Sequence, residues 1–134
     1  MPKILSCISE KGGVGKTTTV LHIAVGLQRF HDMRVLVVDT DYQRGGLTCR
    51  IRPEMLENFR LGEIESGTLY HAYQSLYSGQ NKLPSLKVLH TNTMPDLIAA
   101  DPRLNSVSVD KMPPTNSLRD NNKMLIRHLT LIHR

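Results

Sequence analysis

Residues 6–20 of the chain, SCISEKGGVGKTTTV, combine glycine, lysine and threonine in an order that binds phosphate. The usual phosphate loop, G-x-x-x-x-G-K-[ST], ends as this stretch does at residues 15–17. Glycine permits the dihedral angles that let consecutive backbone N–H groups surround an anion. We therefore predict that a nucleotide phosphate is bound by Gly12, Gly13, Val14, Gly15, Lys16, Thr17 and Thr18.

The side chains of this loop have different predicted tasks. Lys16 is expected to reach the β- and γ-phosphates, and the hydroxyl of Thr17 is expected to ligate Mg²⁺. A helix that begins near Lys16 would add its positive N-terminal end. The loop departs from the usual pattern at Glu10, where glycine is expected, and Lys11 supplies a second positive charge.

Two aspartates follow an apolar run at residues 34–39. Parallel α/β sheets bind ligands at the carboxyl ends of their strands, so Asp39 and Asp41 are expected near the phosphates. Such carboxylates hold water on Mg²⁺ or orient the attacking water. The structural alternative is that Asp39 only ends the strand and Asp41 makes a turn.

The elements that must position these groups are read from hydrophobic periodicity. Residues 3–9 and 34–39 are predicted as buried strands and residues 16–30 as the helix between them, which gives a right-handed βαβ unit. Cys7 is then a small core residue. Further predicted elements are helices at 53–59, 68–77 and 123–134, a strand at 86–90, a helix at 96–104 interrupted at Pro102, and a loop at 107–116.

Composition limits the function classes. The 134 residues suggest one domain with an ordinary globular composition, and no apolar run approaches the roughly 18 residues that span a bilayer. No secretory signal is present at the N-terminus, so a cytoplasmic location is expected. A net charge of +5 suits nucleic acid or an anionic nucleotide, but 4% aromatic residues disfavour a base-stacking platform. Neither the cysteines nor the histidines have metal-ligand spacing.

The motifs KGGVGKTT and DTDYQRGGLT together resemble the ParA/MinD family of deviant Walker-A ATPases over residues 3–48. A looser likeness continues through LYHAYQSL and DLIAADPRL. The pattern D-x-D-x-Q, made by Asp39, Asp41 and Gln43, is most similar to that of the partitioning branch of the family. The resemblance implies an α/β fold, with a mostly parallel P-loop NTPase-like sheet flanked by helices, and ATP with Mg²⁺ as cofactors.

The resemblance also implies roles for individual residues. Lys11 matches the family's signature lysine, which reaches across a dimer to the nucleotide of the partner subunit. Thr18 is implied near the α-phosphate, Asp41 in hydrolysis, and Asp39 near the metal that Thr17 ligates. The chain departs from the family where Tyr42 replaces the usual proline and where QRGGLT is one residue longer.

In the family, a helix like residues 123–134 leads into a strand that carries the Walker-B aspartate. The sequence ends before such a strand. Residues 1–134 are therefore expected to be the N-terminal part of a ParA-like P-loop ATPase domain, as a truncation, a split gene product or a chain that a partner completes. A sheet without that strand would expose unpaired backbone groups.

The leading functional hypothesis is an ATP-binding, ParA-like protein of plasmid or chromosome partitioning. ATP would drive formation of a homodimer that binds DNA non-specifically at the nucleoid and meets a centromere-binding partner protein. Weak hydrolysis would depend on a Walker-B segment. The alternative is a non-enzymatic module that regulates or completes a full-length ParA-like partner. A MinD-like membrane switch is disfavoured by the short helix at 123–134, and an iron–sulfur reductase by the lack of cysteine beyond Cys49.

Overall fold

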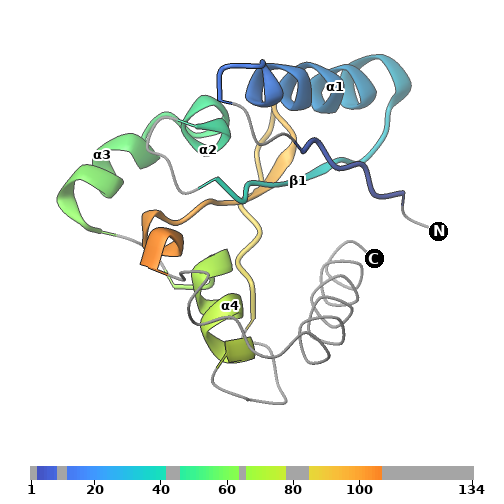
Figure 1. Cartoon of the computed structure of the whole chain (residues 1–134). Coiled ribbons are helices and arrows are strands. Elements are labelled where there is room, and N and C mark those ends of the chain that lie inside the picture. The colour runs from blue at the N-terminus through green and yellow to red at the C-terminus, as the bar shows by residue number, and fades with distance from the viewer. Residues whose placement is uncertain (1–2, 9–11, 42–45, 64–65, 78–84, 107–134) are drawn as a thin grey trace.

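The computed structural model describes residues 3–8, 12–41, 46–63, 66–77 and 85–106 (Figure 1). Two short strands lie at the centre of the described part, with helices on both sides. In chain order, the elements are α1 (Lys16–His31), β1 (Leu36–Val38), α2 (Leu47–Ile51), α3 (Met55–Leu61), α4 (Leu69–Tyr77), β2 (Asp96–Ile98) and the 3-10 helix η1 (Pro102–Ser106).

The sheet pairs β1 with β2 in parallel, and Val37 lies opposite Leu97. Side chains alternate between the two faces of a strand, and the core is divided accordingly. Val37 and Leu97 pack with Ala24 of α1, whereas Ile98 packs with residues of α4 on the other face. Figure 1 shows α1 and α4 on opposite sides of the strands. The predicted α/β class with a parallel sheet flanked by helices is confirmed.

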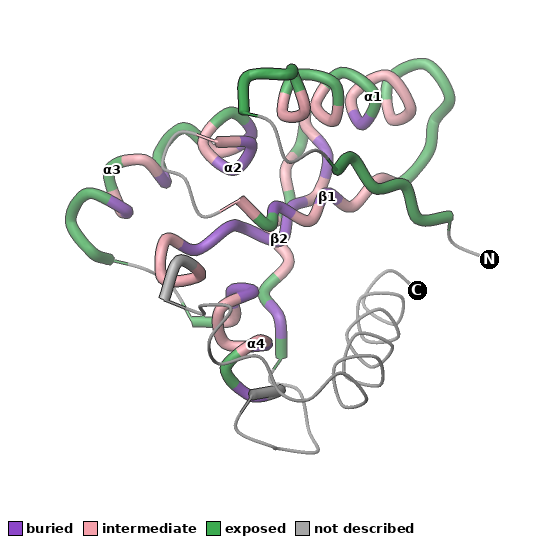
Figure 2. The backbone as a smooth tube through the Cα atoms, viewed as in Figure 1, coloured by how far each residue is buried: buried purple, intermediate pink, exposed green. Residues whose placement is uncertain are grey.

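Helix α1 confirms the strongest of the helix predictions. It begins at Lys16, and Asp32 ends it in the left-handed conformation with φ of 50°. Ala24 is buried, and Val20 and Leu21 pack against the same cluster. The opposite face is exposed, as Figure 2 shows, and Phe30 has 78% of its surface accessible.

The predicted strand at 3–9 is wrong over its described part. Residues 3–8 form no strand, and Ile4, Leu5 and Ile8 are 67%, 75% and 87% exposed (Figure 2). Cys7 is exposed and does not enter the core. A strand forms only with a hydrogen-bonding neighbour, and no described residue bonds through its backbone to residues 3–8. The predicted βαβ unit is therefore not formed within the described residues.

The later predictions are partly correct. α4 confirms the predicted helix at 68–77, and α3 lies two residues later than the helix predicted at 53–59. The predicted helix at 96–104 is wrong, since β2 occupies its start and η1 begins at Pro102. The predicted strand at 86–90 is reduced to one antiparallel bridge from Leu89 to Leu97. The predicted loop at 107–116 and helix at 123–134 lie outside the described residues.

Candidate functional site

The glycine loop lies directly before α1, on an exposed part of the molecule. Gly13 and Gly15 have φ of +73° and +83°, values that residues with a Cβ atom rarely adopt. A Cβ atom built on Gly12, Gly13 or Gly15 would meet no atom of the described residues within 4 Å. Within that part of the chain, the space above this backbone is open, as a site for an external anion requires.

Among the described residues, neither a side-chain cap nor an acidic residue of the first turn compensates the positive N-terminal end of α1. Gly15 provides no side-chain cap, and the first turn contains no acidic residue. Four backbone N–H groups at the start of any helix lack an intrahelical acceptor. Since the helix has 16 residues, these groups and its dipole favour an anion at this end. The residues present thus fit a phosphate group.

The side chains predicted for this site begin α1. Lys16 and Thr17 are half-buried and Thr18 is exposed, so the first turn presents a cation and two hydroxyl groups beside the glycines. Lys11, the predicted second lysine, lies outside the described residues.

The carboxylate of Asp39 closes the loop that follows β1. Its Oδ2 accepts hydrogen bonds from the backbone N–H and the hydroxyl of Thr48, both at 2.7 Å, and its Oδ1 accepts one from the N–H of Asp41 at 3.2 Å. Asp39 is only 5% exposed. Burial raises the pKa of Asp39, and the hydrogen bonds from Thr48 and Asp41 only partly oppose that rise. Asp39 and Asp41, which the sequence predicts at one site, are therefore joined by a hydrogen bond, and Asp39 is buried.

The sequence pattern assigns no role to Thr48, although this residue ends the motif QRGGLT. It lies in the first turn of α2, where Gly46 provides no side-chain cap. Asp39 takes the place of that cap because it accepts the N–H of Thr48. The hydroxyl of Thr48 also accepts a hydrogen bond from the backbone N–H of Ala100 at 2.9 Å, two residues after the end of β2. The residue thus joins α2 to the ends of both strands.

Helix α2 also packs against α1, the helix that follows the glycine loop. α1 and α2 are in contact, and Figure 1 shows α2 beside the N-terminal end of α1. Helix α2, which the periodicity of the sequence does not predict, therefore touches α1 and supplies the Thr48 that binds Asp39.

A second buried carboxylate, Asp101, follows β2. It accepts hydrogen bonds from the hydroxyl of Thr68 and from Arg103, whose Nε and Nη2 lie 3.0 Å and 2.7 Å from the two carboxylate oxygens. Burial alone would raise the pKa of Asp101, but the hydrogen bonds from Arg103 and Thr68, with the positive charge of Arg103, lower it. The guanidinium also lies 4.5 Å from the centre of the Tyr70 ring. This cluster fastens η1 to α4 and is structural.

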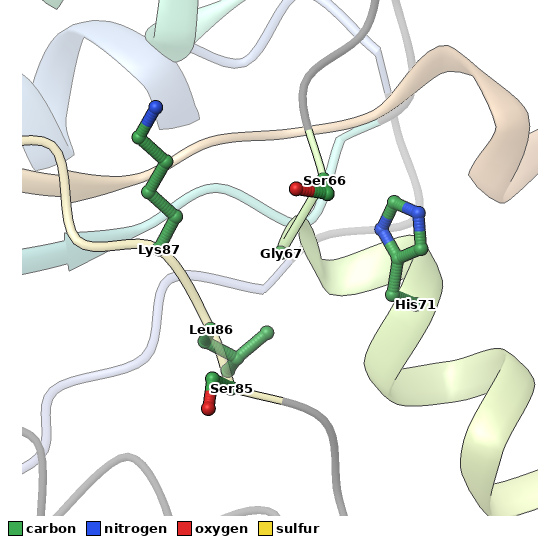
Figure 3. Close-up of a pocket in the computed structure, with 6 residues that line it drawn as sticks. All are labelled: Ser66, Gly67, His71, Ser85, Leu86 and Lys87. Carbon is green, nitrogen blue, oxygen red and sulfur yellow. The ribbon is translucent and has the colours of Figure 1, made fainter.

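A pocket of about 330 Å³ lies between the start of α4 and residues 85–87 (Figure 3). Figure 3 shows the Lys87 ammonium directed away from the imidazole of His71. The polar groups do not converge on one point, so the pocket does not have the form of a specific anion site. Its lining residues are Ser66, Gly67, His71, Ser85, Leu86 and Lys87.

No helix in the described part of the chain has the length and the apolar character that crossing a bilayer requires.

Comparison with known proteins gives one family and several relatives. A family model described as AAA domain (AAA_31) matches residues 2–133. A ParA family protein of Chlamydia pneumoniae is 28% identical over 107 residues, which are 80% of this chain and 37% of the relative. ParA family proteins of Chlamydia trachomatis and Chlamydia muridarum are 44% identical over 41 residues, which are 31% of this chain and 16% of each relative. No solved structure matches. The chain thus spans well under half the length of these curated relatives.

Proposed function

This chain belongs to the AAA domain family AAA_31, a ParA/MinD-type P-loop family, and from this premise we propose that it binds ATP with Mg²⁺ at residues 12–18. The single observation that carries the proposal is the uncapped N-terminus of α1, preceded by open glycine backbone and followed at once by Lys16 and Thr17. Families with this loop bind the phosphates of a nucleotide through such groups.

Each residue of the loop has a proposed contact. The N–H groups of residues 12–15 surround the phosphates, Lys16 contacts the β- and γ-phosphates, and Thr18 lies toward the α-phosphate. The Thr17 hydroxyl ligates Mg²⁺. The described residues contain no cluster of three or more His, Cys, Asp or Glu side chains that could hold a metal.

Bound Mg²⁺ would neutralise charge on the phosphate oxygens. The protein's own acids contribute beside it: Asp41 orients the attacking water, and Asp39 lies near the metal without being a direct ligand. Its burial and its hydrogen bonds to Thr48 support this indirect role.

The remainder of the proposal concerns assembly. ATP joins two copies of the chain, and Lys11 of each copy neutralises charge at the nucleotide of the other. The dimer binds DNA non-specifically and serves plasmid or chromosome partitioning with a centromere-binding partner protein. The resemblance of the loop and the names of the ParA family relatives support this part.

Mg²⁺-dependent ATP binding by the purified chain tests the proposal. Replacing Lys16 with alanine removes a charged hydrogen bond worth about 1.5–3 kcal/mol, so we expect affinity to fall roughly tenfold to a hundredfold. Lys3→Ala, which removes an exposed lysine outside the loop, should bind ATP as the wild type does. Absence of Mg²⁺-dependent binding at millimolar ATP would refute the proposal.

The exposed apolar segment at residues 3–8 favours a second candidate function. Ile4, Leu5 and Ile8 are exposed, and no described residue hydrogen-bonds to their backbone from its own. This segment would pair with a strand of a full-length ParA-like protein, so that the chain regulates or completes that protein. Mixing the chain with such a protein and measuring ATP-driven assembly tests this candidate. ATP turnover by the chain alone, comparable to that of a complete family member, would exclude it.

A further inference from the structure

We infer that Thr48 is a positioning residue that acts through Asp39 to fix the backbone of Asp41. The inference rests on the proposed function only in the role of Asp41 in hydrolysis. It gives separate tasks to the two acids of the DTD motif: Asp39 holds the loop, and Asp41 is the acid presented to the nucleotide.

The hydrogen bonds join the end of β1 to the start of α2 through the side chain of Asp39. Thr48 is nine residues beyond Asp39, and its N–H and hydroxyl meet the same carboxylate oxygen. The other oxygen holds the N–H of Asp41. A shift of Thr48 therefore moves the carboxylate and, with it, the backbone of Asp41.

The hydroxyl of Thr48 has two simultaneous tasks. It donates to Asp39 and accepts from the N–H of Ala100, and Thr48 is only 1% exposed, so water does not replace either bond. A buried polar group that loses its partner keeps the full cost of desolvation. Serine can perform both tasks, whereas valine, with nearly the shape of threonine, can perform neither.

The same bonds support an indirect role for Asp39 at the metal. Its carboxylate accepts three hydrogen bonds and is 5% exposed. A carboxylate offers about four acceptor sites, so these bonds leave Asp39 little capacity to ligate a metal directly while it holds Thr48 and Asp41. Asp41 is less buried than Asp39 and lies two residues after it.

The decisive experiment compares Thr48→Val with Thr48→Ser by NMR-detected amide exchange. We expect Thr48→Val to accelerate exchange of the Asp41 amide about tenfold, the effect of losing one hydrogen bond, and Thr48→Ser to remain within about threefold of wild type. Thr93→Val, which alters an exposed threonine, is the control and should change nothing at Asp41. If Thr48→Val does not fold, Asp39→Asn gives the same readout, because one carbonyl oxygen cannot replace both carboxylate oxygens.

Steady-state kinetics supply the functional readout. Misplacement of Asp41 should lower kcat for ATP by roughly tenfold to a hundredfold in Thr48→Val and leave the Kd for ATP within about twofold, with recovery in Thr48→Ser. Unchanged Asp41 exchange, or unchanged kcat despite faster exchange, overturns the inference. A wild-type chain that binds no ATP, or that binds ATP without turning it over, bears on the proposed function instead, and the exchange measurement still decides whether Thr48 holds Asp41.

Discussion

Ala100 donates its backbone N–H to the hydroxyl of Thr48 at 2.9 Å, although the two residues are 52 positions apart. The carboxyl ends of parallel strands meet at one edge of a sheet, so the segments that follow β1 and β2 come together there. Each segment contains a buried aspartate that accepts a hydrogen bond from a threonine at the start of a helix, Thr48 in α2 for Asp39 and Thr68 just before α4 for Asp101. This edge of the sheet is therefore built from polar contacts that only the folded chain can make.

Two glycines with similar backbone angles should respond differently to alanine. Gly67 has φ of +83°, and a Cβ there would lie 3.0 Å from the N of Lys87 and 3.1 Å from the O of Ser85, whereas Gly62, with φ of +74°, has open space. We expect Gly62→Ala to cost about 1–2 kcal/mol from backbone strain, and Gly67→Ala roughly 2–4 kcal/mol because crowding adds to the strain. Urea unfolding measures both changes, and equal losses would contradict the crowding expected at Gly67.

Arg103→Met should destabilise the fold more than removal of an exposed ion pair. Arg103 is 39% exposed, but its partner Asp101 is fully buried and would be left with the Thr68 hydroxyl and the backbone N–H of residue 103. We expect a loss of about 1–3 kcal/mol, the cost of an incompletely satisfied buried group after allowance for solvent screening at Arg103. Arg60→Met breaks a pair with Glu57 in which both side chains are 63% exposed, and it should stay within about 0.5 kcal/mol. Similar losses in the two variants would show that the contacts of Asp101 add no stability.

The two buried aspartates should give opposite pH dependence. Because the pKa of Asp101 is lowered from its ordinary 3.8, its stabilisation is present above that pH and is lost as pH falls through the folded-state pKa. The pKa of Asp39 is raised, so its contribution is complete below pH 3.8 and is lost as pH rises through the folded-state pKa. The cost of Asp101→Asn should therefore shrink on acidification, and the cost of Asp39→Asn should shrink as pH increases. Denaturant unfolding of each variant and wild type at several pH values measures these trends, and parallel trends would be evidence against the opposed shifts.

The sequence predicts those parts of the fold that depend on local pattern. α1 follows from helical spacing at Val20, Ala24 and Leu27 after a glycine loop, and the apolar run around Val37 forms β1. The segment at 3–8 has an equally good strand composition, but a strand requires a neighbour, and none of the described residues pairs with it. Leu97 and Ile98 form a short apolar run that fits a helix or a strand by periodicity, and pairing with β1 decides between them.

The residues of the candidate site also fall into those that local sequence pattern predicts and those that it does not. The motifs locate the glycine loop and the pair Asp39 and Asp41 because their spacing is local. Thr48 and Asp101 are not predicted, since their roles arise from contacts with distant segments. Threonine after glycines and an aspartate before proline are common in loops, so neither residue gives a distinctive signal.

The conformation of Gly15 should be necessary for phosphate binding. Alanine at φ of +83° costs about 1–2 kcal/mol, and the loop would relieve that strain by turning its N–H groups away from the phosphates. We expect Gly15→Ala to weaken ATP binding about tenfold or more. Gly26→Ala is the matched control, because Gly26 lies inside α1 with open space for a Cβ and should gain up to about 1 kcal/mol in stability with unchanged affinity. Calorimetric titration with Mg²⁺ and ATP distinguishes the two variants, and equal affinities would mean that this angle is not needed.

Lys11 provides the test of assembly. If its ammonium acts on the nucleotide of the other copy, Lys11→Ala should keep ATP affinity within about twofold, because the chain's own loop still holds the phosphates, and should abolish ATP-driven dimerisation. Lys16→Ala should lose both properties, since without bound nucleotide the interface is incomplete. Light scattering during size-exclusion chromatography, with and without Mg²⁺ and ATP, measures the mass of each variant. A Lys11→Ala chain that still dimerises with ATP would assign the second lysine to its own subunit, and one that no longer binds ATP would make Lys11 part of the primary phosphate site.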